Sequence, residues 1–77
     1  MIEKQVGYEL KALRNRNGLT IENAAEGLNI NKDTLCKYEN DASNIQIGKL
    51  KKILDFYKED IFIFFKNINE YIHKNNC

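Results

Sequence analysis

The stretch TIENAAEGLNINKDTLCKYEN, residues 20–40, decides the fold because it contains two short helix signals almost back to back. Thr20 is a good N-cap, since its hydroxyl can accept a hydrogen bond from a backbone N–H of the first helical turn. Apolar residues then recur at helical spacing from Ala24 to Leu28, which gives one stripe of about two turns. Asn29 ends this helix, because Asn tolerates the left-handed conformation that helix exits often need.

A second helix signal follows at once. Asn31 can cap it, with Ile30 packing just before the cap. Leu35 and Tyr38 are its inward residues. Only Asn29 and Ile30 separate the first helix from the second cap, and a connection this short forces the two helices to cross steeply. That crossing is the helix-turn-helix arrangement.

The polar face of the second helix carries Lys32, Asp33, Cys36 and Lys37, which fall on one outward side. An α-helix fits the DNA major groove, where side chains of its N-terminal half can reach base edges. A solvated helix face of mixed charge would show the same pattern. The pattern alone leaves both readings open.

Length and composition point to one small domain. The chain has 77 residues, of which 43% are hydrophobic, and contains no proline. Its net charge of +1, from 12 Lys and Arg against 11 Asp and Glu, is low for a nucleic-acid binder. No apolar run is long enough for a membrane span and no signal peptide begins the chain, so we expect a cytoplasmic protein without a membrane partner.

No pattern of catalytic or metal-binding residues accompanies these helices. His73 is the only histidine, and Cys36 and Cys77 are too far apart in sequence for a CxxC metal motif. We expect both cysteines to be reduced thiols. A Gly-rich phosphate loop is also missing. The sequence predicts a protein that is not an enzyme and that uses no metal, cofactor or small-molecule ligand.

Helical periodicity predicts three further helices. They run over residues 2–17, 46–57 and from 61 into the C-terminal third, with a frayed end from Lys74 to Cys77. The run of β-branched and aromatic residues from Ile61 could also form a strand. Gly7 suggests a close helix contact, and Gly18 is placed as a helix C-terminal glycine.

The last predicted helix is too apolar for a domain of this size to bury completely. An exposed apolar patch usually marks a partner surface, so we predict a homodimer. The alternative is that Phe62 or Ile63 folds back to close the core. The predicted dimer interface consists of Ile61, Phe64, Phe65, Ile68, Tyr71 and Ile72.

Three segments together resemble the lambda-repressor-like (Cro/repressor, XRE-type) helix-turn-helix family. They are VGYELKALRNRNGLT at 6–20, AAEGLNIN at 24–31 and KYEN at 37–40. The resemblance implies an all-α, compact five-helix bundle whose third helix reads DNA. The small size, the apolar final helix and Ile45 are similar to the controller proteins of restriction–modification systems.

The resemblance also implies roles for single residues. Lys32, Asp33 and Lys37 match base-contacting positions, with Cys36 beside them. Arg14 and Glu39 match an ion pair between the first and third helices, and a bidentate Arg–carboxylate pair is a specific geometric clamp. The positions expected at the DNA backbone are Thr20, Asn31, Asn40 and Arg16.

Four departures from the family pattern predict weaker non-specific DNA binding. Ile21 stands where Gln is usual, which removes one polar phosphate contact. Asp41 replaces a usual Gly at a position expected to need positive φ, and the loop DASN at 41–44 lacks basic residues. Ile45 replaces a common Pro.

We therefore expect a sequence-specific transcriptional regulator that binds double-stranded DNA at a palindromic operator as a homodimer. Residues 1–65 would form the DNA-binding domain, and residues 66–77 a helical dimerisation extension. The alternative is a non-enzymatic, antitoxin-like interaction module that has lost DNA binding, which the low net charge and the acidic loop favour.

Overall fold

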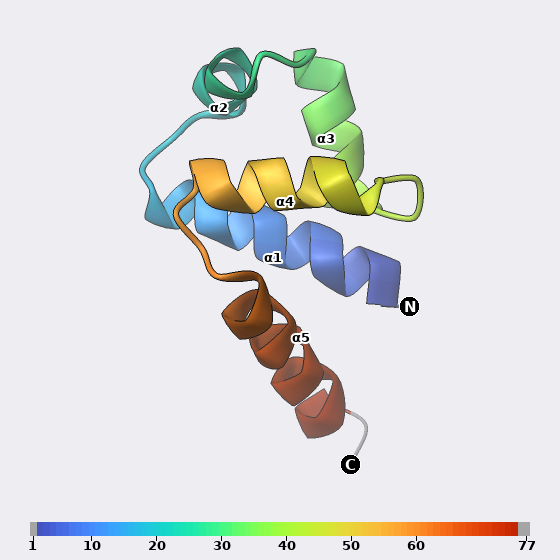
Figure 1. Cartoon of the computed structure of the whole chain (residues 1–77). Helices are drawn as coiled ribbons and strands as arrows, with labels where there is room; N and C mark the ends of the chain where they lie inside the picture. Colours follow the sequence, from blue (N-terminus) through green and yellow to red (C-terminus); the bar gives the residue numbers. More distant parts are fainter. Residues whose placement is uncertain (1, 76–77) are drawn as a thin grey trace.

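The structure, a computed structural model, describes residues 2–75, which form five α-helices (Figure 1). They are α1 (Ile2–Arg16), α2 (Ile21–Leu28), α3 (Lys32–Asn40), α4 (Ile47–Phe56) and α5 (Ile61–Asn75). No strand occurs in this range, so the predicted all-α five-helix fold is confirmed and the strand alternative for the C-terminal third is wrong. The predicted boundaries agree within one residue for α1 and α4.

The helices are arranged around α1, which packs against α3 and α5, while α2 packs against α3 and α4. Figure 1 shows α2 and α3 crossing steeply at one end of the molecule, whereas α5 extends away at the other end. The helix-turn-helix and the last helix therefore occupy opposite ends of an elongated chain of 39 × 22 × 21 Å.

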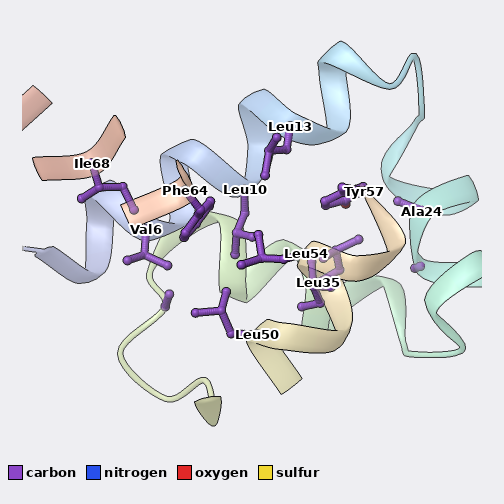
Figure 2. Packing of buried hydrophobic residues seen from close by; sticks show 13 residues of the cluster. Val6, Leu10, Leu13, Ala24, Leu35, Leu50, Leu54, Tyr57, Phe64 and Ile68 are labelled. Atoms are coloured by element: carbon purple, nitrogen blue, oxygen red, sulfur yellow. The ribbon is translucent and has the colours of Figure 1, made fainter. Parts of the chain in front are cut away.

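One hydrophobic core joins all five helices (Figure 2). Its largest fully buried side chains are Leu10, Leu35, Ile53, Leu54 and Phe64. Each contributes about 1.5–3 kcal/mol by leaving water. These side chains come from α1, α3, α4 and α5, so the core joins α3 to α1 and α4, while α3 also packs directly against α2.

Two glycines have the structural roles expected of them. A Cβ on Gly7 would lie 2.6 Å from the carbonyl oxygen of Glu39 and 2.7 Å from that of Tyr38, so α1 touches the backbone of α3 there. Gly18 follows α1 with φ of 69°, which is the left-handed conformation of a helix C-terminus.

The C-terminal third is one continuous helix. The expected boundary between residues 1–65 and 66–77 falls inside α5, and α5 includes Lys74 and Asn75, the first part of the segment expected to fray. Asn76 and Cys77 lie outside the described residues. No helix within residues 2–75 is both long and apolar enough to cross a membrane.

Candidate nucleic-acid interface

The helix-turn-helix is built by local capping, as its sequence predicts. The Thr20 hydroxyl accepts a hydrogen bond from the Asn23 N–H at 3.1 Å. Asn29 has φ of 57° and ψ of 45°, and its N–H and that of Ile30 both donate to carbonyls of the last turn of α2. The Asn31 side chain then accepts from the Asp33 N–H at 2.7 Å, which starts α3. This short turn sets the crossing of α2 and α3.

The outward face of α3 carries the four side chains that sequence analysis places there. Lys32, Asp33, Cys36 and Lys37 are all exposed. On the opposite face Leu35 is completely buried. The helix is therefore anchored along one side and leaves basic, acidic and thiol groups to solvent along the other.

The predicted ion pair between Arg14 and Glu39 is present and bidentate. Arg14 Nε donates to Glu39 Oε2 at 2.8 Å, and Arg14 Nη2 donates to Glu39 Oε1 at 3.2 Å. Nη1 of the same guanidinium donates to the Leu19 carbonyl at 2.9 Å, between α1 and α2. The side chains of Arg14 and Glu39 are only 11% and 6% exposed. One guanidinium thus ties together α1, the entry to α2 and the last turn of α3.

The electrostatics of this clamp favour the charged form of Arg14. The hydrogen bonds to Glu39 raise the pKa of Arg14 above its ordinary value, although burial acts in the opposite direction. A charged pair in a largely buried site is stable only while both partners are present. The clamp therefore positions α3 and is mostly hidden from an incoming partner.

The candidate backbone contacts lie at helix ends. The Oδ1 of Asn31 is used by its cap, but its amide nitrogen is not engaged by that bond and can donate to phosphate. Asn40 is exposed at the end of α3. Arg16, at the end of α1, donates to Glu9 Oε2 at 3.0 Å, so a phosphate contact by Arg16 would have to compete with Glu9.

The acidic loop after α3 differs from its predicted backbone. Asp41 has φ of −161° and ψ of 112°, an extended conformation, so the expectation of a positive φ is wrong. Its side chain instead accepts from the Ser43 N–H at 3.0 Å, and the Ala42 N–H donates to the Glu3 carbonyl of α1. Ile21 is another of the four departures from the family pattern, and it is half-buried against the core. It therefore packs at the position where the usual Gln would contact phosphate.

The predicted dimer interface on α5 needs correction at two positions. Phe64 is completely buried and Ile68 is 3% exposed, because both pack in the core of the single chain (Figure 2). They cannot contact a second copy. Phe62 and Ile63 are exposed, so the alternative that one of them closes the core is also wrong.

A different set of apolar side chains remains at the surface of α5. Ile61, Phe65 and Ile72 are half-buried against the core, and Tyr71 is exposed and stacks on Tyr8 of α1 with ring centroids 6.3 Å apart. Phe62, which the predicted interface does not include, is 81% exposed. The run of five apolar residues at 61–65 necessarily covers more than one helix face, so the sequence already indicated that one of them would stay exposed, as Phe62 does.

The described part of the chain has no metal-binding cluster of side chains. Among residues 2–75, no three His, Cys, Asp or Glu side chains gather where they could hold a metal ion. Cys36 is a free, exposed thiol. The side chain of His73 and all of Cys77 lie outside the described part of the chain.

The fold and its exposed third helix define a helix-turn-helix protein, and comparison with known proteins agrees. A family model described as helix-turn-helix matches residues 10–64, more than half of the chain. The chain therefore belongs to this helix-turn-helix family of DNA-binding transcription regulators.

Solved structures of one protein resemble the chain over nearly its whole length. A tyrosine-to-alanine mutant of the restriction–modification controller protein C.Esp1396I has a TM-score of 0.88 and 23% identity, and the match covers 96% of each chain. The wild-type controller in its triclinic form gives 0.87, with 23% identity and 95% of each chain covered. At this level of identity the likeness establishes the fold. No curated protein matches the chain.

Proposed function

We propose that the chain regulates transcription by binding a roughly palindromic DNA operator as a homodimer, with α3 in the major groove. The observation that carries this proposal is the exposed face of α3, held from behind by a buried bidentate clamp. A helix fixed in this way can hold a constant register against base edges.

The four exposed residues of α3 have chemistry suited to base readout. Lys32 and Lys37 can donate to O6 and N7 of guanine, whereas the Asp33 carboxylate can accept from N4 of cytosine. Cys36, between them, offers a small side chain that permits close approach to a base. Together they would prefer a G·C-containing half-site.

Phosphate contacts would fix the position of α3. Thr20 begins α2 and Asn31 begins α3, and the N-terminus of a helix favours anions because its backbone N–H groups and dipole point there. Asn40 would hold the backbone near the end of α3. Arg16 would contribute after exchanging Glu9 for a phosphate.

The apolar surface of α5 would form the dimer. With α5 at the far end from α3, a two-fold axis through the α5 surfaces leaves both reading helices exposed (Figure 1). The revised interface consists of Ile61, Phe62, Phe65, Tyr71 and Ile72. Two linked helix-turn-helix units offset the low net charge, because once one unit is bound to DNA the second binds its half-site at high effective concentration. Half-site centres would lie about one helical turn apart, ~34 Å.

The matched solved structures are restriction–modification controllers, and we extend that role to this chain as part of the proposal. The residues most directly responsible for it would be those of α3. Under this proposal, residues 1–65 would contain the DNA-reading part, and the following residues of α5, 66–75, would extend the dimer helix.

Selection of bound sequences from random duplex DNA with the purified chain tests the proposal. We expect enrichment of one inverted repeat with G·C pairs in each half-site. Failure to enrich any sequence would reject the DNA-binding proposal. It would favour the antitoxin-like interaction module, which the low net charge and Asp41 also support.

A further inference from the structure

We infer that Glu22 is a specificity-determining residue of the proposed DNA contact, because it directs the Lys32 ammonium toward neutral base edges and away from phosphates. The inference rests on the proposed function. It concerns how a chain with a net charge of only +1 separates its operator from other DNA.

The structural basis is an ion pair that spans the turn of the helix-turn-helix. Lys32 Nζ, at the first residue of α3, lies 3.8 Å from Glu22 Oε2 in the first turn of α2. The two side chains are 54% and 64% exposed. An exposed pair of this kind contributes little to folding. We therefore look for the effect of this ion pair in how the exposed face of α3 would contact DNA.

The pair changes which acceptor Lys32 favours. An ammonium group has three N–H donors and a compact charge, so a lysine alone pairs with phosphate or guanine alike. The O6 and N7 atoms of guanine are uncharged and can share the ammonium with Glu22. A phosphate bound to the same ammonium would lie within several ångströms of the carboxylate, and the two negative charges would repel. Glu22 therefore penalises phosphate pairing more than base pairing.

The position of Glu22 makes this repulsion effective. Glu22 comes two residues after Thr20, a proposed backbone contact, and Asp33 directly follows Lys32 on α3. DNA that does not offer the right base edges to Lys32 could engage this ammonium only through a phosphate, which would then lie close to the Glu22 carboxylate. Such discrimination against wrong partners is a general use of charge at interfaces.

The test compares the parent with Glu22→Gln, which removes the charge and keeps the size. Binding is measured against the selected operator and against a scrambled duplex of equal composition, at several salt concentrations. We expect affinity for scrambled DNA to rise about fivefold, with a smaller change for the operator, so that the specificity ratio falls. The salt slope on scrambled DNA should steepen by about 0.9, one additional phosphate contact.

Two matched variants separate this role from bulk charge. Glu26→Gln makes the same charge change one turn further along α2, where the described chain shows no ion pair with Lys32, and should leave the ratio near that of the parent. In a Lys32→Gln background, Glu22→Gln should have little further effect. An equal effect of Glu26→Gln, or a full effect without Lys32, would overturn the inference.

Failure of the inference is distinguishable from failure of the proposed function. If the parent binds its selected operator and Glu22→Gln leaves the specificity ratio unchanged, only the inference is wrong. If the parent prefers no duplex at all, the DNA-binding proposal fails and the inference fails with it.

Discussion

At the scale of single residues, the orientation of α3 depends on Gly7, which has no side chain. Gly7 lets α1 approach the last turn of α3 until the two backbones touch, near the carbonyls of Tyr38 and Glu39. Arg14, two turns further along α1, then reaches Glu39. The close approach and the ion pair act on the same end of the reading helix.

Gly7→Ala should destabilise the fold by about 1–3 kcal/mol, because the new Cβ would overlap backbone atoms that cannot move aside. Urea unfolding followed by circular dichroism measures the change. Gly48→Ala is the matched control. It lies in α4, where a new Cβ would meet no atom within 4 Å, and should stabilise the fold by up to about 1 kcal/mol. Equal effects of the two substitutions would contradict the contact.

Arg14→Ala and Glu39→Ala should each cost about 3–5 kcal/mol, since each leaves a charge in a largely buried site without its partner. The double variant should lose less than the sum of the two. Denaturant unfolding of all four proteins gives the coupling free energy. Strictly additive losses would show that the two side chains do not interact in solution.

Tyr57 provides a pH-dependent test. Its hydroxyl is buried without a hydrogen-bond partner among the described residues, and burial, with a smaller effect of Glu39, raises its pKa to about 12. Because the folded state holds this proton more tightly than the unfolded state, the corresponding stability is complete below pH 10 and is lost as the pH rises towards 12.

Tyr57→Phe should therefore be neutral or stabilising by about 1 kcal/mol at pH 7, since it removes an unsatisfied hydroxyl. Between pH 10 and 12 its stability should fall less steeply than that of the parent. Thermal unfolding across this range, with exposed Tyr8→Phe as the control, measures the difference. Parallel curves for parent and variant would mean that Tyr57 ionises with the same pKa in the folded and unfolded states, which would contradict the burial of its hydroxyl.

At the scale of the element, α3 is where DNA recognition can be measured. Lys37→Ala should weaken binding to the selected operator by about 1–3 kcal/mol and relax the base preference at one position, if it reads guanine. Helix content should not change, because Lys37 is exposed. Lys52→Ala, an exposed lysine of α4, is the control and should keep the base preference. If Lys37→Ala binds the operator as tightly as the parent does, Lys37 does not contact a base.

The elements that could be predicted from sequence are those with local causes. Thr20, Asn29 and Asn31 determine both ends of α2 and the start of α3 through hydrogen bonds to residues within a few positions, and each behaves as expected. Asp41 does not. The expectation of positive φ came from a family position normally occupied by Gly, whereas here the Asp side chain closes its own turn onto Ser43 in an extended backbone.

The site was less predictable where it depends on long-range packing. Helical periodicity in α5 identifies an apolar stripe but does not say what covers it. Phe64 and Ile68 belong to that stripe and pack in the core of the single chain, so they are unavailable to a second copy. The ion pair of Lys32 with Glu22 likewise appears only when the turn brings α2 and α3 together.

At the scale of the whole molecule, the surface of α5 predicts the oligomeric state. Sedimentation of the parent at micromolar concentration should give a dimer. Phe62→Asp should give a helical monomer with weakened operator binding, because it places a charge in the proposed interface. Ile47→Asp is the control, since Ile47 is 67% exposed but lies in α4, outside the proposed interface. A monomeric parent, both free and on DNA, would reject the dimer.

The placement of α3 and α5 at opposite ends has a mechanical consequence for such a dimer (Figure 1). In that dimer each protomer would act as a lever that turns about α5 and carries α3 at its far end, with an arm no longer than the 39 Å length of the chain. Over that length, a rotation of about 5° at the pivot displaces the tip by about 3.4 Å, the rise of one base pair. Small adjustments where two α5 helices meet would thus be magnified at the DNA. The spacing between half-sites would be tuned at the pivot, far from any residue that touches a base.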